Sequence, residues 1–257
     1  MTTSQLRVEE VTKVYERGEV LALKDVSFHV EKGEFLILIG LSGSGKSTLL
    51  RCINRLIEPT TGKIYLDDTD VTTAKGAELR RIRRKIGMIF QQFNLVKRSS
   101  VLTNVLAGRL GYAARWRTLT GRFSKEDLER ARHSLDRVGL SEKIYSRADQ
   151  LSGGQQQRVG IARALMQEPE LLFADEPVSA LDPATSNSVL QYLEQMNQRD
   201  GVTVICALHF LSLARRYGTR IIALKDGEIV FEGLPAEIDA ARFKEIYGED
   251  AEEVEIL

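Results

Sequence analysis

The sequence predicts an α/β fold built around a largely parallel β-sheet that is covered by helices. Short apolar runs of strand length alternate with helical patterns over residues 35–53 and again over residues 171–224, and this alternation is typical of parallel sheets. The first part of the chain, up to residue 39, indicates strands, whereas residues 102–167 carry helical patterns with charged faces. The length of 257 residues suits one large domain or a domain with a subdomain.

The individual elements follow in chain order. Residues 25–30 alternate polar and apolar side chains, which is the pattern of a half-buried strand. The apolar run 35–39 predicts a buried strand, and the loop after it leads into a helix that reaches Ile53. The further strands that we expect lie at residues 63–66, 171–174, 202–208, 220–224 and 227–231. The further helices of the second half lie at residues 184–197 and 210–217.

Composition excludes some classes of protein. Lys and Arg together number 36 and are matched by 36 Asp and Glu, so the net charge is zero and a nucleic-acid partner is not expected. The cysteines, Cys52 and Cys206, fit no metal-binding spacing and are predicted to be free, buried thiols. The longest apolar runs, 35–41 and 204–208, are far shorter than the ~20 residues of a membrane helix. No signal peptide opens the chain, so a soluble protein is expected.

The loop at residues 40–47 fits the pattern G-x-x-x-x-G-K-[ST], with a predicted strand before it and a predicted helix after it. Glycines let the backbone approach a phosphate group and point several N–H groups at it, and the helix adds its positive end. Lys46 supplies a charge for the β and γ phosphates, and Ser47 supplies a hydroxyl for Mg²⁺. The candidate ATP-binding residues are Gly40, Ser42, Gly43, Ser44, Gly45, Lys46, Ser47 and Thr48.

The apolar strand at residues 171–174 ends on two neighbouring acids, Asp175 and Glu176. Buried strands rarely finish on paired carboxylates unless a cation or a reaction uses them. We expect Asp175 to hold Mg²⁺, and Glu176 to orient and deprotonate the water that attacks the phosphate. The alternative is a strand that simply meets solvent here, and the phosphate loop makes that alternative the weaker one.

A second glycine-rich segment, Leu-Ser-Gly-Gly-Gln at residues 151–155, runs directly into a predicted helix at residues 156–165. Backbone N–H groups at the start of a helix favour a bound anion. A flexible linker or a tight turn is the alternative, and the direct entry into a helix disfavours it. The candidate binding residues of this segment are Ser152, Gly153, Gly154 and Gln155.

With this segment the chain resembles the ABC transporter ATPases over nearly its whole length, with the motifs in that family's order. The resemblance implies an α/β P-loop NTPase core with a mixed, mostly parallel sheet, an N-terminal antiparallel β region and an inserted helical subdomain. Residues 1–257 would then form one ABC ATPase domain. Residues 1–90 and 168–257 would make the catalytic core with its β region, and residues 91–167 the helical subdomain that carries the signature.

The same resemblance implies roles for single residues. Tyr15 matches the aromatic residue that stacks on adenine, and Gln91 matches the glutamine that senses Mg²⁺ and the attacking water. Asp182 matches a further nucleotide-site position, and His209 matches the switch histidine near the γ-phosphate. The implied catalytic residues are Glu176, His209 and Gln91, and the implied metal ligands are Ser47, Gln91 and Asp175.

The resemblance also implies a mechanism and partners. Two copies would pack head to tail, so that each ATP lies between the phosphate loop of one copy and Ser152, Gly154 and Gln155 of the other. Closing on ATP and opening after hydrolysis would move a separate integral membrane permease. The expected location is the cytoplasmic face of the cell membrane, as a peripheral subunit. An extracytoplasmic substrate-binding protein would be an indirect partner.

Residues 90–96 and the insert 112–123 look similar to the corresponding stretch of phosphonate importer ATPases. Phe210 and the order of residues 178–180 depart from that group, which leaves a phosphite importer or another close branch open. The alternative interpretation of the insert is a surface hairpin or helix without a special role. The basic run 80–85 is typical of a solvated helix face, with a contact to anionic lipid or to a permease as the alternative.

Other functions stay open at this point. The chain could serve another ABC importer, for an amino acid or another small anion, or an exporter. From a different class, a soluble ABC ATPase of translation or DNA repair is the competing hypothesis, although such relatives usually carry two cassettes or a long coiled coil.

Overall fold

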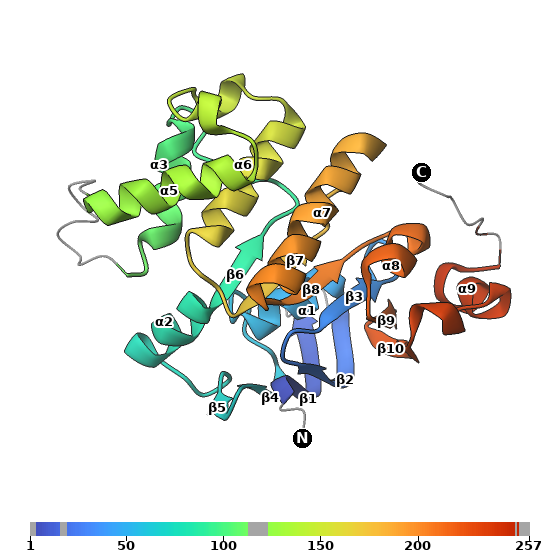
Figure 1. The fold of residues 1–257 in the computed structure, drawn as a ribbon. Helices are drawn as coiled ribbons and strands as arrows, with labels where there is room; N and C mark the ends of the chain where they lie inside the picture. Colours follow the sequence, from blue (N-terminus) through green and yellow to red (C-terminus); the bar gives the residue numbers. More distant parts are fainter. Residues whose placement is uncertain (1–3, 16–19, 113–122, 250, 252–257) are drawn as a thin grey trace.

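The computed structural model describes residues 4–15, 20–112, 123–249 and 251. Within them the chain forms two sheets: a four-stranded antiparallel sheet in the order β2-β1-β4-β5, and a six-stranded mixed sheet in the order β10-β9-β3-β8-β7-β6. Helices gather above the larger sheet in the upper part of Figure 1, and the smaller sheet lies at the bottom. The predicted α/β class, with an N-terminal antiparallel region and a mixed sheet, is confirmed.

The smaller sheet is built from the first strands of the chain. The half-buried pattern at residues 25–30 belongs to β2, in which Val26, Phe28 and Val30 are buried and the alternating residues 25, 27 and 29 are exposed. β2 pairs with β1, and β1 also pairs with β4, both antiparallel. The bounds are β1 Ser4–Tyr15, β2 Val20–Glu31, β4 Thr61–Leu66 and β5 Thr69–Asp70.

The larger sheet contains a parallel block of β9, β3, β8, β7 and β6, to which β10 adds antiparallel at one edge. β3, β6, β7 and β8 are buried along their whole length, as a parallel sheet covered on both faces requires. The bounds are β3 Phe35–Ile39, β6 Ile86–Ile89, β7 Leu171–Asp175, β8 Thr203–Ala207, β9 Arg220–Lys225 and β10 Glu228–Gly233.

Helices cover the larger sheet on one face, and α1 with the smaller sheet covers the other. Consecutive residues of β3 show this directly, because Ile37 belongs to one apolar core and Leu38 to a second. The α-helices of the described residues are α1 Lys46–Ile53, α2 Gly76–Lys85, α3 Val101–Leu106, α5 Lys125–Arg137, α6 Gly153–Leu165, α7 Pro183–Asp200, α8 Leu211–Tyr217 and α9 Ala240–Tyr247. Short 3-10 helices are η1 Ala107–Arg109, η2 Ser141–Lys143, η3 Ala148–Gln150 and η4 Pro235–Glu237.

Most predicted elements occur within a few residues of their expected bounds, whereas β5, β6 and α9 were not predicted from the sequence patterns. β6 was not predicted as a strand because four residues are too few to show a period, and α9 was not predicted as a helix. Cys52 and Cys206 are free and buried, as expected. Residues 113–122 of the insert 112–123 lie outside the described residues. In the described chain no helix combines the length and apolar character that crossing a membrane requires.

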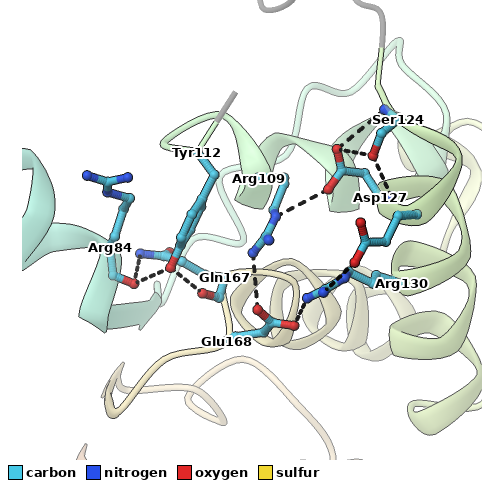
Figure 2. A network of polar contacts seen from close by, with 9 residues as sticks. Arg84, Arg109, Tyr112, Ser124, Asp127, Arg130, Gln167 and Glu168 are labelled. Atoms are coloured by element: carbon cyan, nitrogen blue, oxygen red, sulfur yellow. Dashed lines mark hydrogen bonds and ion pairs between the residues drawn. The ribbon is translucent and has the colours of Figure 1, made fainter. Parts of the chain in front are cut away.

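A set of polar contacts ties the helical region to the core (Figure 2). The Gln167 amide follows α6 and donates to the carbonyl oxygens of Arg83, Arg84 and Ile86 at 2.5, 3.2 and 2.9 Å. The hydroxyl of Tyr112 donates to the carbonyl of Gln167 at 2.9 Å and to that of Arg84 at 3.2 Å. We call Arg84, Tyr112 and Gln167 the clasp. It joins the end of α6 to the junction of α2 and β6.

Replacing Gln167 with alanine should lower the free energy of unfolding by about 1–2 kcal/mol, because three partly buried carbonyls lose their donor. Denaturant unfolding of the two proteins measures the difference. Gln198→Ala is the matched control, because Gln198 is exposed and its amide donates to one side chain, Glu194, within α7. The control should change stability by less than about 0.5 kcal/mol, and equal effects of the two changes would contradict the role of the clasp.

Candidate nucleotide and catalytic site

The loop at residues 40–47 joins the fully buried β3 to the start of α1. Gly45 is the N-cap of α1 and has a φ of 105°, a left-handed conformation that disfavours any side chain. A Cβ there would also lie 2.7 Å from the carbonyl oxygen of Ala22. Glycine is therefore required for the loop to close over the helix, and the free N–H groups of α1 face the space inside the loop.

Lys46 is the buried cation of this loop. Its side chain is 3% exposed, and Nζ donates to the carbonyl oxygens of Gly40 and Leu41 at 2.7 and 3.0 Å. Burial lowers the pKa of Lys46, and the nearby charges of Glu176 and Asp175 act in the opposite direction. Nζ lies 3.9 Å from Oε1 of Glu176. The loop thus holds a positive charge away from bulk water, where its attraction for an anion is strong.

A cavity of about 210 Å³ opens at this loop, lined by residues 42–48 together with Ala22, Gln91 and Glu176. The hydroxyl of Ser44 is buried there and has no hydrogen-bond partner among the described residues. The buried Lys46 and the start of α1 line the same cavity, so the residues present fit the phosphate groups of a nucleotide.

Asp175 and Ser47 face each other where β7 meets α1. The carboxylate of Asp175 is fully buried, and its Oδ1 accepts a hydrogen bond of 2.5 Å from Oγ of Ser47. Arg51, one turn further along α1, donates to Oδ2 at 3.2 Å. A serine hydroxyl beside a carboxylate is an oxygen pair of the kind that Mg²⁺ prefers, so these residues fit that ion.

Glu176, His209 and Gln91 come together although they are far apart in the sequence. Oε1 of Glu176 lies 2.7 Å from Nε2 of His209, and Oε2 accepts a hydrogen bond of 2.9 Å from the amide of Gln91. The sheet register explains the meeting. Ile89 pairs with Ala174 and Asp175 pairs with Ala207, so β6, β7 and β8 end at one level, and the three side chains come one or two residues after these strand ends.

The hydrogen bond from His209 is the largest cause that holds the pKa of Glu176 below its ordinary value, and burial opposes it. The charges of His209 and Lys46 add to the lowering. Glu176 therefore stays ionised to a lower pH than a free carboxyl does, which keeps it available as a proton acceptor.

His209→Ala should move the acid limb of the pH–rate profile for ATP hydrolysis to higher pH. The change removes the largest cause of the lowered pKa, so the carboxyl of Glu176 takes up its proton at a higher pH and the base is lost earlier on acidification. The profile of kcat/KM against pH measures the shift. His133→Ala, an exposed histidine on α5, is the control. An acid limb at the same pH in all three proteins would contradict the coupling.

The signature residues lie at the start of α6, outside the lining of this cavity. Ser152 is the N-cap of α6, and its side chain forms a reciprocal capping box with Gln155. A side chain at Gly154 would collide with Thr185 at the start of α7. Asp182 is the N-cap of α7 and accepts hydrogen bonds of 3.0 Å from the backbone N–H and 2.7 Å from the hydroxyl of Thr185. The starts of α6 and α7 therefore pack together.

Tyr15 lies beside the loop, with its hydroxyl 3.5 Å from that of Thr48 and its side chain partly exposed. Sequence reasoning did not select two residues of the site. Ala22 lines the cavity, and nothing in its local pattern distinguishes it. Arg51 bonds Asp175, and its spacing of one helical turn from Ser47 is a signal that could have found it.

The fold and the site define an ATP-hydrolysing cassette, and comparison with known proteins gives the family. The family model described as ABC transporter matches residues 23–179, and the chain belongs to that family. Among solved structures, the dimeric ATP-binding cassette MJ0796 bound to ADP and phosphate is similar, with a TM-score of 0.79 and 41% identity, over 90% of this chain and 98% of that one. The ADP form of the cassette MJ1267 has a TM-score of 0.79 and 29% identity, over 97% and 96%.

Curated relatives are more similar still. The phosphonates import ATP-binding protein PhnC of Bdellovibrio bacteriovorus is 58% identical over 250 residues, which cover 97% of this chain and 95% of that protein. The protein of the same name from Bacillus anthracis is 55% identical, over 98% of each chain. That from Staphylococcus aureus is 52% identical, over 99% of this chain and 98% of the relative.

Proposed function

We propose that this chain is the ATPase subunit that energises import of a phosphonate, or of a related phosphorus oxyanion, through a separate membrane permease. The observation that carries the proposal is the identity of 52% to 58%, over nearly the whole chain, with phosphonates import ATP-binding proteins. An importer of the same family for an amino acid or another small anion is the second candidate, because the cargo need not touch the ATPase subunit.

The phosphate loop binds the β and γ phosphates of ATP. Lys46 holds its charge inside the loop, and the N–H groups of α1 complete the cradle. Tyr15, at the edge of the loop, carries the adenine ring. Since the loop is already in this shape, little of the binding free energy is spent on ordering it.

Glu176 is the base that takes a proton from the attacking water, and Gln91 and His209 hold its two oxygens in place. Mg²⁺, held by Ser47, Asp175 and Gln91 with the phosphates, would supply positive charge to the oxygens on which negative charge develops. Phosphoryl transfer depends mostly on positioning, so the convergence of side chains from three strand ends supports this assignment.

A second copy of the chain completes each site. The lining of the cavity at the phosphate loop contains no residue of the signature segment. That segment forms the start of α6, elsewhere on the surface, with Ser152, Gly153, Gly154 and Gln155. A head-to-tail pair brings that helix start, with the neighbouring Asp182, to the phosphates held by the other copy. The dimeric state of the similar cassette MJ0796 supports this arrangement.

We assign the permease contact to a groove of about 340 Å³ between the core and the helical region. Arg80 and Arg84 of α2 and the exposed Leu56 line it, so it fits a short segment with one apolar and one acidic side chain. In this proposal the subunit lies at the cytoplasmic face of the membrane, as a peripheral subunit. We divide the chain into a core of residues 1–90 and 168–257 and a helical subdomain of residues 91–167, which meet at this groove.

The test is reconstitution of the chain in vesicles with a phosphonate permease and its substrate-binding protein. ATP hydrolysis should rise when the binding protein is loaded with aminoethylphosphonate or with phosphite, and a complex carrying Glu176→Gln should not respond. A rise with an amino acid alone would overturn the cargo and leave the ATPase assignment intact. Copurification with ribosomes or DNA, and not with the permease, would overturn the transport function.

A further inference from the structure

Arg51 is a basic residue at the site that the proposed reaction does not use. It lies on α1 one helical turn after Ser47, so both side chains project from the same face of the helix toward β7. Its Nη2 donates to Oδ2 of Asp175 at 3.2 Å. The side chain of Arg51 is 42% exposed, whereas that of Asp175 is 0% exposed. The pair therefore joins a half-exposed cation to a fully buried anion.

Both carboxylate oxygens of Asp175 are engaged in this arrangement. Oδ1 accepts from the hydroxyl of Ser47 and Oδ2 from Arg51. A fully buried carboxylate is strongly destabilising without a counter-charge. The buried Lys46 lies within ion-pair distance of Glu176 and donates to loop carbonyls. Arg51 is thus the cation that directly compensates Asp175.

The Ser47 hydroxyl and the Asp175 carboxylate are also the groups assigned above to the magnesium ion. The inference about Arg51 therefore rests on that proposed function. A divalent cation beside Ser47 and Asp175 brings two positive charges close to the guanidinium, and like charges repel in a site of low polarity. Because the side chain of Arg51 is half-exposed, its guanidinium can turn to solvent without opening the core.

We propose that Arg51 is a placeholder for the magnesium ion. Without the ion it neutralises Asp175 and keeps the carboxylate bonded to Ser47, so the ligand pair is held in place before loading. When the ion binds, Arg51 gives up its hydrogen bond. Arg51 is a positioning residue in this scheme, since it acts on the metal site through Asp175.

Arg51→Gln should make the magnesium-free protein less stable and make its binding of Mg²⁺ tighter. The magnesium-free protein loses the counter-charge of Asp175, so its melting temperature should fall by about 2–4 °C. The ion no longer competes with the guanidinium, so its apparent dissociation constant should fall by about threefold to tenfold. A side chain that merely supports the fold would lower stability without tightening the metal site. Arg51→Lys, which keeps the charge, should lie between the two proteins in both measurements.

The experiment titrates Mg²⁺ into the full chain saturated with the non-hydrolysed analogue AMP-PNP, with Mn²⁺ monitored by electron paramagnetic resonance as a second probe. Thermal unfolding is recorded without metal and without nucleotide. Arg242→Gln is the matched control, because Arg242 is 49% exposed and pairs with Glu245 on α9. The control should leave the metal affinity unchanged.

Three results would overturn the proposal. Unchanged or weaker Mg²⁺ binding by Arg51→Gln would show that the arginine does not compete with the ion. Weaker binding of AMP-PNP by this variant in the absence of metal would make Arg51 a phosphate ligand instead. A wild-type chain that fails to bind Mg²⁺ with AMP-PNP would overturn this inference and the proposed function together, whereas the first two results leave the proposed function standing.

Discussion

Replacing Glu176 with glutamine should lower the rate of ATP hydrolysis by at least about a hundredfold and leave ATP binding nearly unchanged. Glutamine has the shape of glutamate but cannot accept a proton from the attacking water. The side chain is 11% exposed and lies at the end of β7 beside the phosphate loop, so the substitution leaves the cradle for ATP intact. Because hydrolysis is what would release the dimer, the variant should accumulate as a dimer when ATP is present.

Phosphate release under saturating ATP, nucleotide affinity and gel filtration with ATP measure the three expected results. Glu170→Gln is the matched control, because Glu170 lies just before the opposite end of the same strand, where it accepts a bond from Lys85 at 3.1 Å. The control should hydrolyse ATP at the wild-type rate. Hydrolysis by Glu176→Gln within a few-fold of wild type would remove Glu176 from the role of base.

Local patterns were sufficient to predict most of the strands and helices that build the core. The run at β3 and the alternation in β2 are visible in the sequence because each follows the period of its burial. β6 was not predicted because its four residues are buried on every side and show no period. Its place beside β7 is decided by pairing with a strand far along the chain, which no local pattern carries.

The residues of the site were also predicted in part. The phosphate loop and the acid pair are contiguous, so spacing alone indicated Lys46 and Asp175. His209 and Gln91 were proposed through the family's motif order, and only the shared edge of the sheet brings them to Glu176. The bond between Arg51 and Asp175 was not predicted, since it joins two elements that the sequence analysis treated separately.

Heterodimers that carry Lys46→Ala and Ser152→Ala in defined combinations should show that each nucleotide site is shared between two copies of the chain. Lys46→Ala removes the buried charge of the phosphate loop, and we expect a loss of hydrolysis of at least about a hundredfold in a homodimer. Ser152→Ala removes a hydroxyl that would reach the phosphates of the other copy, with an expected loss of about tenfold or more. The prediction concerns their combination in heterodimers purified through two different tags.

A heterodimer of one Lys46→Ala chain with one Ser152→Ala chain should keep one intact site, because both changes fall on the same nucleotide. A heterodimer of a doubly substituted chain with a wild-type chain should keep none, because each nucleotide then meets one change. The first pairing should therefore hydrolyse ATP faster than the second. If the signature served the phosphate loop of its own chain, the order of the two rates would be reversed, and equal rates would contradict a shared site.

Stability must be separated from chemistry in this test, because Ser152 is also the N-cap of α6. Losing such a cap costs about 1 kcal/mol. Ser124→Ala supplies the control, since Ser124 caps α5 through the same reciprocal box with Asp127 and lies outside the lining of the nucleotide cavity. Both substitutions should lower the melting temperature to a similar extent, and only Ser152→Ala should lower hydrolysis. If Ser124→Ala lost as much hydrolysis, the effect of Ser152→Ala would be explained by the lower stability of its helix and not by a contact with the phosphates.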